Sequence, residues 1–361
     1  MKVAVLGAGN GGCAVAADMS ARGHEVTLIK TSNSMHNDNF KYLLENNGRI
    51  VMVEKDKETI TNISRVTTDL DLLSEAEVVI VYIQTNYHEE LIERMVPHIR
   101  KGQIILFNPG YLSTAYMLKH HSCEGITIAE AESSFIDCRI SEPGKIKVGF
   151  RNVRNPIGIF PTTNKESAEK VLNELGFPLV YLSSVVEAAL HNPNLIVHTV
   201  GAVMSIPRIE KTKGEYCMYW EVFTPSVWNI LEQLDKEKMD ILESLGYDPI
   251  PYVEACKFRN SLDDSRDAKE VFFWYAAMPT RAKGPTSVDS RYITEDVSQG
   301  LVMLEALGKH LKIKTPVCTS LIELASFALG RDMRLMGRTP ERLGVSNIEK
   351  IIAHSLDKTG V

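Results

Sequence analysis

Two polar side chains interrupt an apolar segment near the middle of the chain. Residues 194–200 read NLIVHTV, so Asn194 and His198 stand four residues apart among aliphatic neighbours. This spacing places both side chains on one face of a helix. Histidine titrates near neutral pH and can donate or accept a proton during a reaction. On these residues alone, His198 is either a core histidine with a satisfied hydrogen bond or a working acid and base.

A second polar segment, SRYITEDVSQGLV at 290–302, carries groups that could assist such a histidine. A carboxylate such as Asp296 can orient an imidazole and stabilise its protonated form. The segment is equally compatible with a structural role. In that case Thr294 caps a helix, Glu295 and Asp296 occupy its first turn, and Arg291 is a solvated charge. The spacing alone does not decide between these interpretations.

A glycine-rich turn follows the first strand-like segment of the chain. Residues 2–6 run into Gly7-Ala8-Gly9-Asn10-Gly11-Gly12 and then into a helical segment, the order typical of a dinucleotide-binding turn. Gly7 would allow the tight turn, Gly9 would allow a pyrophosphate to approach the backbone, and Gly12 would allow the helix to pack against the strand. The helix N-terminus would donate its free N–H groups to the phosphates. We predict that Gly7, Gly9, Asn10, Gly11 and Gly12 bind a nicotinamide dinucleotide.

The second strand-like segment indicates which dinucleotide is preferred. It ends Ile29-Lys30-Thr31-Ser32, without the carboxylate that NAD-preferring sites place near the ribose 2′-hydroxyl. Lys30, with the hydroxyls of Thr31 and Ser32, could instead accept a 2′-phosphate. We therefore predict NADPH as the preferred cofactor, with NADH as the alternative. Lys30 could equally be a solvated surface residue.

The first half of the chain predicts an α/β domain that would position this turn. Strand-like segments alternate with helical ones, and several of the strands are apolar on both faces, which favours a mostly parallel sheet covered on both sides. The predicted strands are 2–6, 25–29, 77–83, 103–107 and 126–130, and the predicted helices are 12–22, 87–99 and 112–120. We predict a doubly wound Rossmann-type NAD(P)-binding domain over residues 1–185.

After about residue 185 the periodicity becomes helical and strand candidates almost disappear. The helical segments are 186–205, 225–245, 265–278, 295–311 and 316–330. Thr224-Pro225 and Thr315-Pro316 are typical of the N-cap and first residue of a helix. We predict an all-α domain over residues 186–361 that carries the catalytic and substrate-binding groups.

The composition disfavours nucleic-acid-binding and membrane-spanning proteins. The chain has 361 residues, 24% of them charged, and a net charge of −6, which disfavours nucleic-acid binding. No segment is apolar enough to span a membrane, and the N-terminus does not read as a signal peptide. Six cysteines without a C-x-x-C pair are typical of free thiols in a reducing compartment. We expect a cytoplasmic protein with small-molecule substrates and no metal; the helical half is compatible with a homodimer.

Several motifs in a fixed order give the chain a resemblance to the opine dehydrogenase family. They span nearly its whole length and comprise GAGNGG at 7–12, GQIILFNPG at 102–110, the segment from Glu132 to Arg139, the Asn194 and His198 pair, YWEVFTPSV at 219–227, R-Y-x-x-E-D-V at 291–297 and GRTPERLG at 337–344. Enzymes of this family condense the amine of an amino acid with a 2-oxo acid, usually pyruvate, and reduce the imine. The resemblance also implies an all-helical second domain.

The resemblance assigns roles to the polar residues described above. It implies that His198 is the catalytic histidine, paired with Asp296, and that Arg291 holds a substrate carboxylate, for which a bidentate guanidinium is well suited. Asn194 would bond a substrate or cofactor amide. The chain departs from the family at Thr199, where proline is frequent, and in the loop Ile83–His88. These differences leave the substrate undefined.

The sequence is compatible with two other functions. One is a reductase of a 2-oxo acid, of the ketopantoate reductase or β-hydroxyacid dehydrogenase kind. Such enzymes rely on a lysine near the start of the helical domain, but Lys211 and Lys213 fall in a polar, glycine-containing segment that reads as a loop. The other is a non-catalytic NADPH-binding sensor, in which His198, Arg291 and Asp296 would have no reason to converge.

Overall fold

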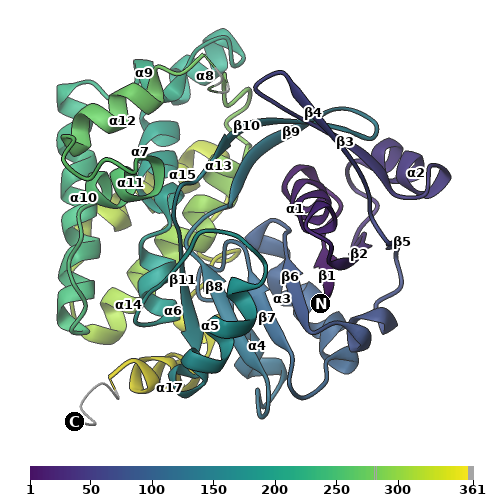
Figure 1. The fold of residues 1–361 in the computed structure, drawn as a ribbon. Coiled ribbons are helices and arrows are strands. Elements are labelled where there is room, and N and C mark those ends of the chain that lie inside the picture. Colours follow the sequence, from purple (N-terminus) through teal and green to yellow (C-terminus); the bar gives the residue numbers. More distant parts are fainter. Residues whose placement is uncertain (280, 282, 357–361) are drawn as a thin grey trace. The chain divides into compact units, whose positions relative to one another are not determined.

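The computed structural model of the chain describes residues 1–279, 281 and 283–356 (Figure 1). They divide into two compact units, Met1–Val185 and Val186–Val361. Among the described residues, no helix is both long enough and apolar enough to cross a membrane. The predicted fold class, a Rossmann-type domain followed by a helical one, is confirmed.

The first unit is built on two β-sheets. Its strands are β1 (Lys2–Leu6), β2 (Glu25–Ile29), β3 (Arg49–Glu54), β4 (Lys57–Asn62), β5 (Arg65–Thr67), β6 (Val78–Val81), β7 (Ile104–Phe107), β8 (Thr127–Ala131), β9 (Ile136–Glu142), β10 (Lys145–Arg151), β11 (Asn155–Phe160) and β12 (Leu179–Tyr181). Its helices are α1 (Asn10–Ala21), α2 (Asn37–Glu45), α3 (His88–Met95), α4 (Thr114–His120) and α5 (Lys165–Asn173).

The larger sheet has the order β12-β11-β8-β7-β6-β1-β2-β5. All neighbours from β5 to β8 are parallel, and β11 runs antiparallel to β8. Leu6 at the end of β1 is aligned with Ile29 of β2 and Val81 of β6. The segments that follow these three strands therefore start at the same edge of the sheet, beside the point where the strand order reverses. In this topology a dinucleotide binds at that edge.

Helix α1 packs between the larger sheet and the smaller one, whose order is β4-β3-β10-β9. Every residue of α1 from Gly12 to Met19 is buried, which a helix covered on one side only could not achieve. The small side chains of its sequence, NGGCAVAADMSA, allow both sheets to approach closely. This packing fixes the helix whose N-terminus adjoins the glycine-rich turn.

The second unit consists of helices, with one isolated β-bridge between Cys217 and Gly284 in its described part. The helices are α6 (Val185–Leu190), α7 (Pro193–Met204), α8 (Ile206–Thr212), α9 (Met218–Glu221), α10 (Pro225–Ser244), α11 (Tyr252–Asn260), α12 (Ala268–Ala276), α13 (Arg291–Thr294), the π-helix η5 (Asp296–Leu301), α14 (Val302–Leu311), α15 (Pro316–Leu329), α16 (Pro340–Leu343) and α17 (Val345–Leu356).

Two predicted helix starts are confirmed, but not their side-chain caps. α10 begins at Pro225 and α15 at Pro316, whereas neither preceding threonine side chain accepts a helix N–H. At α15 the carboxylate of Glu237 performs this role and accepts hydrogen bonds from the N–H groups of Val317 (2.6 Å) and Cys318 (2.9 Å). A tertiary contact has replaced the local cap at this helix.

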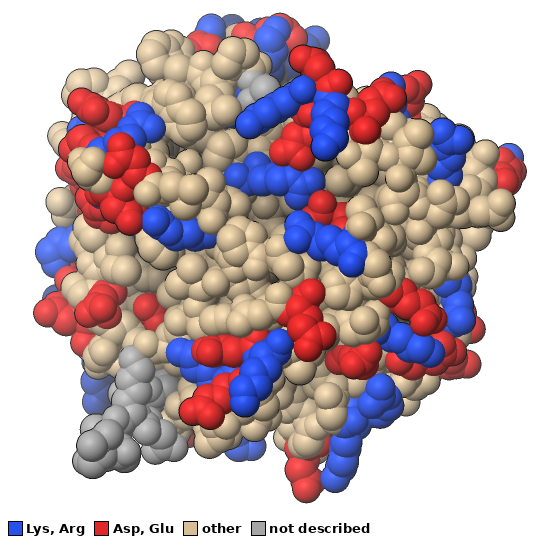
Figure 2. All heavy atoms as spheres, in the orientation of Figure 1, with Lys and Arg blue, Asp and Glu red and all other residues tan. Residues whose placement is uncertain are grey.

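Acidic and basic side chains are interspersed on the face drawn in Figure 2. On that face, the coloured residues form no extended basic stripe of the kind that follows a nucleic-acid backbone. This distribution agrees with the net charge of −6.

Candidate active site

The glycine-rich turn leaves no room for a side chain at Gly7, where a Cβ would lie 2.4 Å from the carbonyl oxygen of Tyr82, or at two further glycines. A Cβ on Gly12 would lie 1.8 Å from the carbonyl oxygen of Gly7, and a Cβ on Gly11 would lie 2.1 Å from the ring of Tyr82. Gly7 itself has φ of 113°, which L side chains rarely adopt. The turn therefore brings β1, α1 and the residue after β6 into direct contact.

Gly9 differs from its neighbours because the space beside it is open. The nearest atom to a Cβ placed there belongs to the His36 imidazole, 3.6 Å away. No side chain caps the first turn of α1, and Gly9 itself is the N-cap residue, so the N–H groups of this turn lie next to Gly9. An open glycine next to uncapped N–H groups fits the pyrophosphate of a dinucleotide.

Asn10 anchors the turn to the second sheet. Its side-chain oxygen accepts a hydrogen bond from the Ile140 N–H (2.8 Å), and its carbonyl accepts one from the Cys138 thiol (3.3 Å). The side-chain oxygen of Asn10 is therefore occupied by its hydrogen bond to β9. The predicted contribution of Asn10 to cofactor binding would have to come from its backbone N–H.

Lys30 does not present its ammonium group as we predicted. Its Nζ donates to the carbonyl of Met35 (2.5 Å) and lies 5.6 Å from the centre of the Phe40 ring, so only 7% of the residue is exposed. Burial lowers the pKa of Lys30. The alternative of a solvated lysine is wrong for the same reason. The segment after β2 folds back over this side chain.

The two hydroxyl residues after Lys30 are more accessible. Ser32 is exposed and its hydroxyl is 3.0 Å from that of Ser34, while the carbonyl of Thr31 accepts a hydrogen bond from Arg94 (3.0 Å). A cavity of about 400 Å³ lies beside them, lined by residues 34–39 and 140–143. His36, which the sequence analysis did not single out, lies in this lining and also adjoins Gly9.

In the second unit, α7 carries the predicted catalytic histidine. Asn192 caps the helix by accepting the N–H of Asn194 (2.9 Å), and Pro193 occupies the first position. His198 follows five residues after Pro193, about one and a half turns later, and is 4% exposed. Asn194 lies on the same helix one turn earlier and is half-buried. Local sequence thus fixes both the start of α7 and the face on which the imidazole lies.

Asp296 and His198, 98 residues apart in sequence, form a buried pair. His198 Nδ1 is 2.7 Å from Asp296 Oδ2, and both side chains are at least 95% buried. An ionised carboxylate only accepts hydrogen bonds, so Nδ1–H is the donor. This fixes one tautomer of the neutral ring and leaves Nε2 as an acceptor.

Two tyrosines that the sequence analysis did not single out complete the surroundings of His198. The hydroxyl of Tyr219 lies 2.7 Å from Nε2 and donates to it. The ring of Tyr292 stacks on the imidazole, with the ring centres 4.0 Å apart. Both tyrosines belong to motifs that carried the family resemblance, at 219–227 and 291–297, and membership of those motifs was the one available signal.

The π-helix η5 holds Asp296 in place and is itself braced by residues 336–338. The N–H of Arg338 donates to the carbonyl of Ser298 (3.1 Å), and the side chain of Gln299 bonds the carbonyl of Met336 (2.9 Å) and Nε of Arg338 (3.0 Å). A Cβ on Gly337 would lie 2.6 Å from the Ser298 carbonyl oxygen. The motif at 337–344 thus supports the helix that presents the carboxylate of Asp296 to His198.

Arg291 lies on α13, one turn before this carboxylate. Its side chain is 46% exposed and its guanidinium is 3.8 Å from Glu295. Partial desolvation of the guanidinium by its neighbours would lower the pKa of Arg291, but the carboxylates of Glu295 and Asp296 outweigh it and raise the pKa above its ordinary value. Arg291 therefore remains a cation and is accessible to a substrate carboxylate.

Comparisons with known proteins find relatives of both units of the chain. Residues 181–329 match the family model of the NAD/NADP octopine/nopaline dehydrogenase α-helical domain, and residues 2–109 match that of the NAD-dependent glycerol-3-phosphate dehydrogenase N-terminus. An opine dehydrogenase from Arthrobacter sp. (strain 1C) is 26% identical over 355 residues, which cover 96% of this chain and 95% of the relative.

Two solved structures share the fold. One is an octopine dehydrogenase in complex with NADH and agmatine, with a TM-score of 0.77, 18% identity and coverage of 100% of this chain and 99% of that one. The other is a yersinopine dehydrogenase with NADP⁺ bound, with a TM-score of 0.70, 14% identity and coverage of 99% and 98%.

Proposed function

We propose that the chain, which belongs to the opine dehydrogenase family of NAD(P)-dependent oxidoreductases, condenses an L-amino acid with a 2-oxo acid and reduces the resulting imine. The expected oxo acid is pyruvate, and the product is an N-(1-carboxyalkyl)amino acid. The observation that carries the proposal is the buried pair of His198 and Asp296 next to the accessible cation of Arg291.

The residues of the helical unit divide the chemistry among them. Arg291 binds the carboxylate of a substrate and so orients it. His198 supplies and removes protons at the carbonyl oxygen, while Asp296 fixes its tautomer and stabilises the imidazolium. Asn194 bonds a substrate or cofactor amide. The nicotinamide, when bound, supplies the hydride that reduces the imine.

NADPH is the proposed cofactor, with NADH as the alternative. The absence of a carboxylate after β2 supports this choice, and Ser32 and His36 are the groups beside the cavity that could face a 2′-phosphate. Lys30 would contribute through its charge rather than by direct contact, because its ammonium is bound to Met35. We place the enzyme in the cytoplasm, where its six free thiols would stay reduced.

The test is oxidation of NADPH, and separately of NADH, with pyruvate and a panel of L-amino acids, each beside pyruvate alone. We expect oxidation that requires the amino acid and yields a secondary amine detectable by mass spectrometry. The amino acid with the highest kcat/KM then identifies the product.

Other outcomes of the same assay identify the competing functions. Oxidation with pyruvate or another 2-oxo acid alone would indicate a simple carbonyl reductase. Tight cofactor binding without turnover of any pair would indicate a sensor. Either result would contradict the proposed condensation.

A further inference from the structure

Both nitrogens of the His198 ring are already engaged. Asp296 accepts from Nδ1, and the hydroxyl of Tyr219 donates to Nε2. Tyr292 covers one face of the ring, and the His198 side chain is only 5% exposed. A substrate that approaches Nε2 therefore meets the phenol oxygen of Tyr219 before it meets the imidazole.

The surroundings of Tyr219 favour negative charge on its oxygen. The guanidinium carbon of Arg281 lies 3.8 Å from the centre of the Tyr219 ring and 4.2 Å from that of Tyr275. Tyr219 is 9% exposed, so water screens this charge only weakly. The ionisable groups around the His198–Tyr219 pair come from η5, α13, α11, α12 and the segment after it: Asp296, Arg291, Tyr292, Glu295, Tyr252, Tyr275 and Arg281.

We propose that Tyr219 is a catalytic residue that stands between His198 and the substrate and passes protons in both directions. This inference rests on the function proposed above and adds a named proton carrier to it. A phenol suits this position because one oxygen can accept a proton from the substrate while its own proton moves to Nε2.

The relay balances over the condensation. The ammonium of the amino acid gives a proton to the Tyr219 oxygen as the phenol proton passes to Nε2 of His198, which leaves a neutral amine and an imidazolium. The amine nitrogen forms its bond to the carbonyl carbon, and a proton moves from nitrogen to the alkoxide oxygen. The imidazolium then returns its proton through Tyr219 to the carbinolamine hydroxyl. The C–O bond breaks, water leaves, and the nitrogen lone pair forms the iminium.

Arg281 is a positioning residue in this scheme, because it acts through Tyr219. A cation above the ring makes transient negative charge on the phenol oxygen less costly. Arg281→Gln should therefore shift the pH profile of kcat/KM for the amino acid to higher pH. Arg281→Lys, which keeps the charge, should shift it less.

The decisive variant is Tyr219→Phe, which removes one oxygen and keeps the ring. We expect kcat/KM for the amino acid to fall about 100-fold or more at neutral pH, within the range of general acid–base catalysis. The loss should shrink as the pH rises toward the amine's own pKa, because solution then supplies the neutral amine. Tyr216→Phe is the matched control, since it removes a buried hydroxyl bonded to Ser205 (2.9 Å) and should leave the profile unchanged.

Two results would overturn the relay. If Tyr219→Phe equals or exceeds the wild type at every pH, the phenol merely occupies Nε2 until substrate displaces it. If the loss is the same at every pH, Tyr219 serves only to support the fold. Should the variant not fold, the wild-type rate in mixtures of H₂O and D₂O decides. A curved dependence on deuterium content supports two protons in flight, and a linear one contradicts them.

The relay can fail without the proposed function. Amino-acid-dependent turnover by the wild type tests the function alone, whereas only the pH profile of the variant tests Tyr219. An enzyme that forms the secondary amine with an unaffected Tyr219→Phe variant would refute the relay and leave the condensation in place.

Discussion

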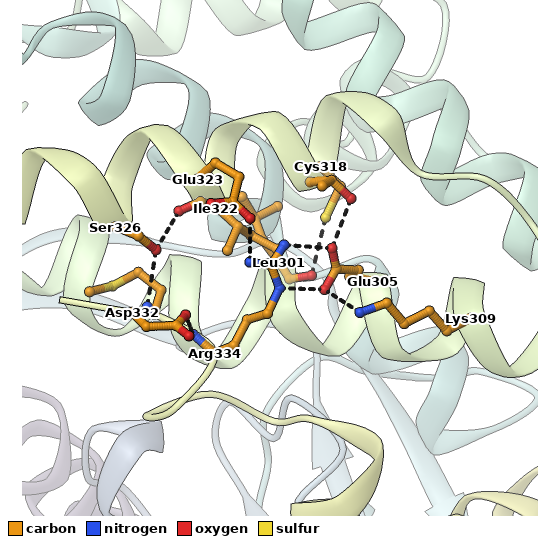
Figure 3. Close-up of polar contacts among 11 residues, drawn as sticks. Leu301, Glu305, Lys309, Cys318, Ile322, Glu323, Ser326, Asp332 and Arg334 are labelled. Atoms are coloured by element: carbon orange, nitrogen blue, oxygen red, sulfur yellow. Dashed lines mark hydrogen bonds and ion pairs between the residues drawn. The ribbon is translucent and has the colours of Figure 1, made fainter.

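Replacing Glu305 with glutamine should destabilise the helical unit in a pH-dependent way. Glu305 on α14 accepts hydrogen bonds from Nε and Nη2 of Arg334, both at 2.8 Å, and from Lys309 (2.9 Å) (Figure 3). The bonds from Arg334 contribute most and lower the pKa of Glu305 from 4.5 to about 2, although burial opposes them. This difference of about 2.5 units corresponds to about 3 kcal/mol at roughly 1.36 kcal/mol per unit.

The sign of the pH dependence follows from the direction of the shift. Because the pKa of Glu305 is lower in the folded state, its stabilisation is complete above the unfolded value of 4.5. It is lost as the pH falls from there toward 2. Glu305→Gln should thus cost about 3 kcal/mol at pH 7 and progressively less below about pH 4.

The assay is urea unfolding followed by tryptophan fluorescence, because all three tryptophans lie in this unit. Glu323→Gln is the matched control: Glu323 binds the same Arg334 (2.6 Å), but its side chain is 45% exposed. That variant should cost less than about 1 kcal/mol. Equal losses in the two variants, or a loss in Glu305→Gln that ignores pH, would refute the reasoning.

Three further predictions concern the glycine-rich turn of the first unit and the surroundings of Asp296 in the second. Asp296→Asn should lower kcat by about 10³-fold or more, because an amide no longer fixes the tautomer of the imidazole. NADPH binding measured by calorimetry should stay unchanged. A loss in kcat under about tenfold would contradict the proposed role of the Asp296–His198 pair. Gly9→Ala should weaken NADPH binding by about tenfold or more without lowering the melting temperature. Gly12→Ala should lower both the affinity for NADPH and the melting temperature, because its Cβ would lie 1.8 Å from the Gly7 carbonyl oxygen. Equal melting temperatures in the two variants would argue against the open space at Gly9. In Gly337→Ala the new Cβ should push on the Ser298 carbonyl and reduce kcat without changing the affinity for the cofactor. Full activity of this variant would show that the contact does not position η5.

Five strands could be predicted from the apolar pattern of the sequence. β1 and β2 have the predicted bounds, and β6, β7 and β8 lie within one residue or two of the predicted segments. β4 was missed because its sequence, KETITN, is exposed along almost its whole length and carries no apolar signal. Strands of this kind are specified by their neighbours in the sheet rather than by their own composition.

In the candidate site too, features formed by adjacent residues could be predicted from the sequence, whereas contacts between residues distant in sequence could not. The glycine-rich turn was readable from its spacing, since strand, turn and helix are adjacent in sequence. The pairing of His198 with Asp296 came from family resemblance, because no periodicity connects residues 98 positions apart. The bond from Tyr219 to the imidazole and the inward turn of Lys30 depend on tertiary contacts that a strand or helix pattern does not encode.

The sequence pattern predicted the helical segment that begins near Asp296 but not the type of its first turns, and that type has a consequence for how the segment tolerates a change in length. We expected one continuous helix over 295–311, but residues 296–301 form a π-helix, which holds one residue more than an α-helical turn would. Loss of any one residue there would let the segment relax to α-helical geometry, in which each residue turns the chain by about 100°. The carboxylate would rotate off the imidazole although every residue that touches the ring was still present. In this segment a deletion of a single codon is therefore more damaging to the contact between Asp296 and His198 than most substitutions, because the contact depends on the number of residues as well as on their identity.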